Sequence, residues 1–150
     1  MGTVRTSAGS SIGFAESGGG ERTPIVFLHG VGSDKSVWHP QLGNFGKSRR
    51  AIAFDYPGYG DSDPAAQGTT RDDYAAAILS AMDALDITRA HVCGLSLGGV
   101  VAIALHHLAP ERCTSLLLAS APSPCLSAQL LKVETAFNFD APPQRSTSEP

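Results

Sequence analysis

The chain has 150 residues, of which 42% are hydrophobic and 17% are charged. This length and composition suit one globular domain and exclude an intrinsically disordered protein. The net charge of −3 argues against a nucleic acid or an anionic membrane as a partner held by bulk charge.

The three cysteines, Cys93, Cys113 and Cys125, show neither a metal-binding spacing nor a disulfide framework. A reducing, cytoplasmic location is therefore expected. No apolar run approaches the roughly 18 residues that a membrane helix needs, and the N-terminus lacks the pattern of a secretory signal. Because no dinucleotide glycine pattern and no cluster of metal ligands is present, we expect neither a cofactor nor a metal.

The first predicted elements are two short strands, residues 4–6 and 11–14, which form a hairpin. Residues 25–28 are a continuous apolar run, which is typical of a strand covered on both faces. This run ends in a loop over residues 29–32, and a short helix is predicted over residues 38–42.

A second buried-strand run covers residues 51–54 and is followed by Asp55 and a turn-rich loop. Residues 70–73 match a capping box, so a helix should begin there and end near Asp86. Apolar side chains recur along this helix at helical spacing, which predicts a stripe facing the sheet. The stripe consists of Tyr74, Ile78, Met82 and Leu85.

A third strand-like run, residues 91–94, precedes a helix over residues 97–108 that Pro110 stops. This helix is apolar nearly all round, so we expect it to be buried. The last predicted strand covers residues 115–119. Alternation of strands and helices predicts an α/β fold, with a mostly parallel sheet and helices on both faces.

Ligands of such a sheet bind at the carboxyl ends of the strands. His29, Asp55, Ser96 and Ser120 fall at or just past these ends. We therefore expect these residues to share one rim of the sheet.

The segment 94–98, with the sequence GLSLG, matches the G-x-S-x-G nucleophile elbow. A serine at a sharp strand-to-helix turn has a strained backbone and a hydroxyl that stands clear of the sheet. Gly94 and Gly98 are needed because larger residues there would collide with the turn. Backbone N–H groups at the start of the helix would favour negative charge beside Ser96.

Three motifs occur in one order along the chain: HGVG at 29–32, DYPGYGDS at 55–62 and the elbow at 94–98. Together they resemble the α/β-hydrolase superfamily over roughly residues 10–122. WHPQL at 38–42 is similar to the branch of 3-oxoadipate enol-lactonases and small carboxylesterases. The resemblance implies a serine hydrolase that cleaves a small carboxylic ester or lactone through an acyl-enzyme on Ser96.

The resemblance also implies roles for the residues around this serine. The backbone N–H groups of Val31 and Leu97 would hold the oxyanion. Gly30 and Gly32 would let the loop approach closely, and His29 would brace the loop rather than act as a base. Asp55 and Asp61 would fix loops rather than serve as catalytic acids, and Trp38 would pack near the pocket.

The same motifs do not indicate which residues would serve as the catalytic base and the catalytic acid. The family order is Ser, acid, His, but no histidine follows His107. His106 and His107 lie roughly 15 Å beyond Ser96 along the predicted helix, because a helix rises about 1.5 Å per residue. His91 begins the strand that Ser96 ends, roughly 16 Å away at about 3.3 Å per residue.

The family's sheet has more strands than this chain supplies. We therefore expect residues 1–122 to be the N-terminal part of an α/β-hydrolase domain. Residues 123–150 would be an atypical tail, the start of a lid or a non-native reading, with a helix over 126–136 and a disordered end. A truncated or frame-shifted hydrolase and a genuinely short family member are the two competing interpretations.

A second interpretation is a non-catalytic or degenerate hydrolase-like module for binding or interaction. It would bind a small acyl ligand without turnover, or pair with another subunit through the open edge of the sheet. We therefore also consider self-association through that edge.

Overall fold

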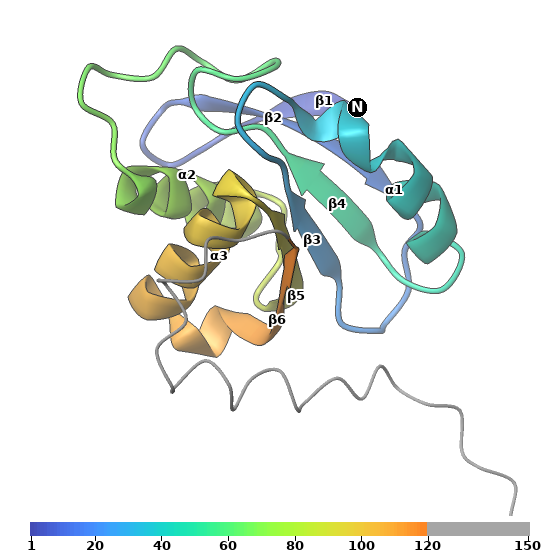
Figure 1. Ribbon diagram of the computed structural model, residues 1–150. Coiled ribbons are helices and arrows are strands. Elements are labelled where there is room, and N and C mark those ends of the chain that lie inside the picture. Colours follow the sequence, from blue (N-terminus) through green and yellow to red (C-terminus); the bar gives the residue numbers. More distant parts are fainter. Residues whose placement is uncertain (120–150) are drawn as a thin grey trace, which may run out of the picture.

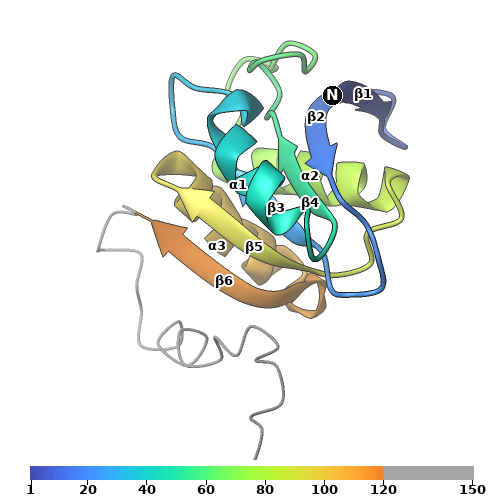
Figure 2. The ribbon, with the colours of Figure 1, turned by 90° about the vertical axis from the view of Figure 1, so that its right-hand side faces the viewer.

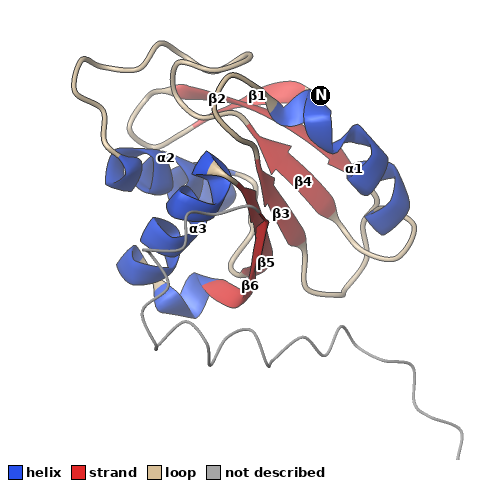
Figure 3. Cartoon of the chain, in the orientation of Figure 1, coloured by secondary structure: helices blue, strands red, loops and turns tan. Residues whose placement is uncertain are grey.

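The computed structural model describes residues 1–119 as a six-stranded sheet with helices on both faces (Figures 1 and 3). The strand order is β1-β2-β4-β3-β5-β6. β2 runs antiparallel to both β1 and β4, whereas β4, β3, β5 and β6 are parallel to one another, so the predicted mostly parallel sheet is confirmed. The strands are β1 (Gly2–Arg5), β2 (Ser11–Ser17), β3 (Ile25–Leu28), β4 (Ala51–Phe54), β5 (Ala90–Leu95) and β6 (Cys113–Ala119).

The helices lie in two layers, one on each face of the sheet. α1 (His39–Phe45) covers one face, and α2 (Arg71–Ala84) and α3 (Leu97–Leu108) cover the other (Figure 2). Two 3₁₀ turns, η1 (Lys35–Trp38) and η2 (Pro110–Arg112), precede α1 and β6. Within residues 1–119 no helix combines the length and the apolar character needed to cross a membrane.

Alternation along β3 explains why its four residues are all apolar. Ile25 and Phe27 belong to the core beneath α1, whereas Val26 and Leu28 belong to the larger core beneath α2 and α3. Side chains that alternate across a central strand bury apolar surface on both faces. Each such side chain stabilises the fold by about 1.5–3 kcal/mol when fully buried.

The predicted capping box begins α2. The Thr70 hydroxyl accepts a hydrogen bond from the Asp73 N–H at 3.3 Å, and the Asp73 carboxylate accepts one from the Thr70 N–H at 2.7 Å. The apolar stripe is also confirmed, because Ile78 and Met82 are fully buried against the sheet.

α2 ends at Ala84, two residues before the expected end. Asp86 adopts a φ of 57°, and the Ile87 N–H donates to the Met82 carbonyl at 2.8 Å. This is the hydrogen bond that closes a Schellman motif, in which a residue in the left-handed region ends the helix.

The structure also corrects the boundaries of one helix and three strands. The segment predicted as a helix over 38–42 is helical from Lys35 to Phe45, because the Asp34 carboxylate accepts from the Ser36 N–H and starts the 3₁₀ turn earlier. Thr6 belongs to the turn of the first hairpin, where its N–H donates to the Ser10 carbonyl. β5 and β6 are longer than predicted, since pairing extends to Ala90 and Cys113.

β6 lies at one edge of the described sheet (Figure 2), where it pairs with β5. Leu117 on this strand is partly exposed. Ser120 and the helix predicted over 126–136 lie outside the described residues.

Candidate active site

Ser96 occupies the turn between the end of β5 and the start of α3. It has φ 53° and ψ −112°, a backbone conformation that non-glycine residues rarely adopt and that carries strain. The Ser96 N–H donates to the Ala119 carbonyl at 2.8 Å, and its own carbonyl accepts from the Gly99 N–H at 2.9 Å. The surrounding sheet and helix therefore hold the strained serine in place.

The two glycines of the elbow lie where backbone segments meet. A Cβ on Gly94 would lie 2.2 Å from the Gly98 carbonyl oxygen, and a Cβ on Gly98 would lie 2.1 Å from the Leu28 carbonyl oxygen. Both distances are far below van der Waals contact, and both obstacles are backbone atoms. Glycine at these positions lets α3 begin directly against the ends of β5 and β3.

The loop after β3 lies beside this turn. A Cβ on Gly30 would lie 3.6 Å from the Ser96 Cβ, so the loop backbone is in contact with the serine. Gly32 has a φ of +71°, which favours glycine. Among the described residues, neither the Val31 N–H nor the Leu97 N–H donates to a backbone carbonyl. Within residues 1–119 these two backbone donors therefore have no backbone acceptor.

His29 is completely buried at the start of this loop. Its Nδ1 donates to the Gly30 carbonyl at 2.8 Å, and its own carbonyl accepts from the Tyr56 hydroxyl at 3.0 Å. Its ring packs against Tyr56 and Tyr59, with centroid distances of 4.5 and 5.1 Å. Burial lowers the pKa of His29 below its usual value, although the Gly30 hydrogen bond and Asp55 act in the opposite direction. These hydrogen bonds connect the start of the loop to Tyr56 and to the Gly30 backbone.

An ion-pair cluster of buried Lys35, buried Asp55 and exposed Asp61 joins the same loop to the loop after β4. The Lys35 backbone N–H donates to Asp55 Oδ1 at 2.7 Å, and Lys35 Nζ lies 2.6 Å from both Asp55 Oδ2 and Asp61 Oδ2. Asp55 Oδ2 also accepts from the Asp61 N–H at 3.0 Å. Burial lowers the pKa of the Lys35 ammonium, but its hydrogen bonds to Asp55 and Asp61 outweigh this effect and raise the pKa overall.

Sequence reasoning missed Lys35. It lies in a polar stretch with no periodic pattern, and its partners are 20 and 26 residues away along the chain. Asp55 and Asp61 were expected to fix loops, and both accept hydrogen bonds that join the two loops. Trp38, expected near the pocket, is buried in the core beneath α1, 4.9 Å from Phe27 between ring centroids.

The other four histidines belong neither to the turn of Ser96 nor to the loop after β3. His91 Nδ1 is 2.7 Å from Ser115 Oγ at the beginning of β5, and His39 is exposed at the start of α1. His106 and His107 lie in the last turn of α3. In residues 1–119 no group of three potential metal ligands gathers in one place.

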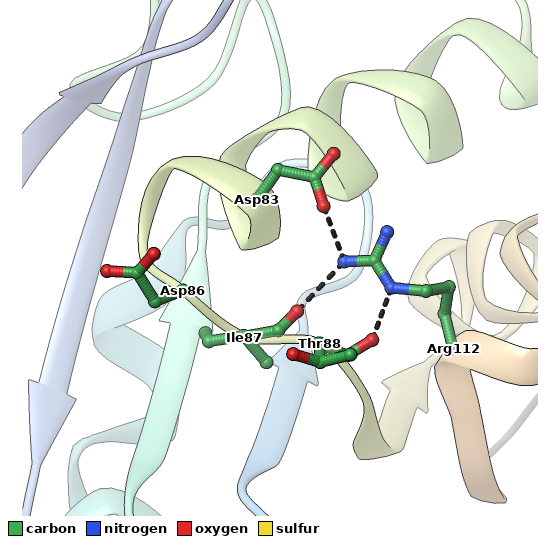
Figure 4. Close-up of a pocket in the computed structure, with 5 residues that line it drawn as sticks. All are labelled: Asp83, Asp86, Ile87, Thr88 and Arg112. Carbon is green, nitrogen blue, oxygen red and sulfur yellow. Dashed lines mark hydrogen bonds and ion pairs between the residues drawn. The ribbon is translucent and has the colours of Figure 1, made fainter.

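A pocket at the opposite end of the sheet is formed by the loop after α2 and by Arg112 (Figure 4). The Arg112 guanidinium donates to the Ile87 carbonyl at 2.8 Å and to the Asp83 carboxylate at 2.7 Å, and it also donates to the Thr88 carbonyl. Because β5 and β6 begin here, this end lies opposite to the carboxyl end of β5 that carries Ser96. Arg112 therefore ties two loops together away from the candidate active site.

Known proteins share this fold. Residues 25–149 match the alpha/beta hydrolase family. The chain belongs to that family.

Among its relatives, the chain is 42% identical over 117 residues to a dihydrolipoyllysine-residue acetyltransferase component of an acetoin cleaving system from Pseudomonas putida, covering 75% of this chain and 31% of the relative. It is 37% identical over 86 residues to 3-oxoadipate enol-lactonase 1 from Acinetobacter baylyi, covering 57% of this chain and 32% of the relative. The enol-lactonase structure from Burkholderia xenovorans matches with a TM-score of 0.71 and 28% identity, over 77% of this chain and 45% of that one. This α/β hydrolase thus spans less than half of the length of each of these relatives.

Proposed function

We propose that this chain carries the nucleophile of a serine hydrolase that cleaves small carboxylic esters or lactones. The observation that carries the proposal is Ser96 in its strained turn, beside a loop where a Cβ added to Gly30 would lie 3.6 Å from the Ser96 Cβ. Similarity to two enol-lactonases supports the choice of ester-type substrates.

In this proposal Ser96 Oγ attacks the carbonyl carbon of the substrate while the hydroxyl proton passes to a general base. The carbonyl electron pair moves onto oxygen, which then accepts hydrogen bonds from the Val31 and Leu97 N–H groups. Collapse of this intermediate breaks the bond to the leaving alkoxide, which takes up the proton. An ester bond to Ser96 remains, and water hydrolyses it.

The Val31 and Leu97 N–H groups are suited to this step because they bear no other backbone hydrogen bond in the described part of the chain. Donors that are already fixed need no reorganisation when charge develops on the substrate oxygen. Loss of one such donor typically costs about 2.7–4 kcal/mol of transition-state stabilisation.

The test is covalent labelling of the purified protein with a fluorophosphonate, read by intact mass. We expect one adduct on the wild-type protein and none on Ser96→Ala. The control Ser36→Ala removes an exposed hydroxyl from η1 and should label like the wild type. An adduct that survives Ser96→Ala would assign the nucleophile elsewhere.

A second candidate function is a hydrolase-like module that binds a small acyl ligand without turnover. It is favoured by the histidines within residues 1–119, because none of them hydrogen-bonds to Ser96. A chain that is folded by circular dichroism and takes up no fluorophosphonate would support this candidate over the first.

A further inference from the structure

We propose that Lys35 is a positioning residue, which sets the Val31 N–H beside Ser96 by tying the end of the loop to Asp55 and Asp61. This inference rests on the proposed function of Ser96. Lys35 is not a catalytic residue in this proposal, because it acts on the site only through the loop backbone.

The contacts of Lys35 restrain both its backbone and its side chain. Its N–H and its ammonium donate to the two oxygens of the same Asp55 carboxylate, at 2.7 and 2.6 Å. The ammonium also donates to Asp61 at 2.6 Å. Three charge-assisted hydrogen bonds therefore fix the residue that follows the loop, in position and in orientation.

The other end of the loop is held from the same neighbouring segment. The Tyr56 hydroxyl donates to the His29 carbonyl at 3.0 Å, and His29 Nδ1 donates to the Gly30 carbonyl at 2.8 Å. Val31 lies between these two anchors; the residue is 72% exposed and its N–H has no backbone partner in the described chain. The position of this N–H is thus decided by the anchors at residues 29 and 35.

Stability alone does not account for this arrangement. Lys35 is 4% exposed and Asp55 is fully buried, so both charges have lost most of their hydration. Apolar residues of similar volume often replace a buried ion pair without loss of stability. What an apolar pair does not supply is directional hydrogen bonds that fix the loop to a fraction of an ångström.

Charge gives Lys35 a second effect on the same site. Asp55 and Asp61 are the two carboxylates of the cluster, and the Lys35 ammonium is the cation that pairs with both of them. Without the ammonium, two negative charges would remain next to a loop that must accept a developing oxyanion. We therefore expect loss of Lys35 to slow acylation more than it weakens substrate binding.

The experiment compares Lys35→Met, Asp61→Asn and Arg112→Met in the full chain. Asp61 is 65% exposed at its side chain, so Asp61→Asn weakens the tie and leaves the Lys35–Asp55 pair in place. Arg112→Met is the matched control, because Arg112 also ties two loops through a carboxylate and carbonyls, at the other end of the sheet (Figure 4).

Two measurements are made on each variant: the kinetics of p-nitrophenyl acetate hydrolysis and the ¹⁵N order parameters of Gly30, Val31 and Gly32. For Lys35→Met we expect kcat to fall about 10²-fold, the usual cost of misplacing a reacting group by about 1 Å, with little change in KM. The order parameters should fall from about 0.85 to below about 0.6. Asp61→Asn should lower kcat and the loop order parameters as well, but by less. Arg112→Met should lower the Tm and leave kcat and the loop order parameters unchanged.

Wild-type order parameters and wild-type kcat in Asp61→Asn and Lys35→Met would overturn the inference. If Lys35→Met does not fold, the loop order parameters and kcat of Asp61→Asn decide the question. If the wild-type chain forms no Ser96 adduct, the proposed function fails separately, and the order parameters alone still decide whether Lys35 positions the loop.

Discussion

At Gly98 a single hydrogen atom in place of a side chain decides how close two elements come. The missing Cβ would lie 2.1 Å from the Leu28 carbonyl oxygen, which belongs to the backbone of β3 and has no room to move aside. This contact sets the start of α3 against the carboxyl end of β3 and, through it, the position of Ser96 relative to the loop after β3.

We predict that Gly98→Ala destabilises the protein by about 1–3 kcal/mol, the usual range for overpacking a well-packed site. Gly43→Ala is the matched control, because Gly43 lies in α1 with no atom within 4 Å of the added Cβ. It should stabilise the protein by about 0.5–1 kcal/mol through reduced backbone entropy of the unfolded chain. Urea unfolding measures both, and equal midpoints for the two variants would contradict the steric argument.

At the scale of elements, α2 is the helix whose start is most completely explained by local residues. Thr70 and Asp73 satisfy each other's backbone N–H groups, and Asp72 and Asp73 place negative charge in the first turn, where the helix dipole favours it. Because all of these partners lie within four residues of one another, the capping box was predictable before the fold was known.

Thr70→Ala should therefore lower the free energy of unfolding by about 1 kcal/mol, the typical cost of losing an N-cap. Thr70→Ser keeps a hydroxyl at the same position and should retain most of the stability. Thermal unfolding followed by circular dichroism measures both. A loss in Thr70→Ser as large as in Thr70→Ala would show that the methyl group, and not the cap, matters.

For the molecule as a whole, the six-stranded sheet separates two cores and brings the loops after β3, β4 and β5 to one rim. His29, Asp55 and Ser96 share this rim, as expected for residues that follow parallel strands. One consequence is a stability that depends on pH, because burial at the rim lowers the pKa of His29.

The pKa of His29 is lowered in the folded protein, so the unfolded chain binds its proton more readily. The contribution of His29 to the free energy of unfolding is thus fully present above about pH 6.5. It decreases as the pH falls below this value, by up to about 1.4 kcal/mol per pH unit. Asp34 and Asp73, whose pKa values are lowered by hydrogen bonds, contribute stability that is lost only below about pH 4.

We predict that His29→Gln reduces the loss of unfolding free energy between pH 7.5 and pH 5, measured by urea titration at each pH. His39→Gln, which changes an exposed histidine, should follow the wild-type pH dependence. A wild-type slope in His29→Gln would mean that another group carries the effect.

The sequence by itself determined the features that depend on near neighbours. The apolar runs of the parallel strands, the stripe and cap of α2 and the glycines around Ser96 are all local patterns, and the structure contains them. The 3₁₀ turn that begins at Lys35 was not predicted, because its start depends on a polar cap in a stretch without apolar periodicity.

Only the tertiary structure decided the strand order β4-β3-β5 and the cluster of Lys35, Asp55 and Asp61. In this cluster Lys35 meets residues that lie 20 and 26 positions away along the chain. No spacing in the sequence indicates which charged residues will meet. Local patterns report which face of an element is apolar. The pairing of one element with another is chosen by the packing of the whole chain, and this packing places the Lys35 ammonium between two carboxylates.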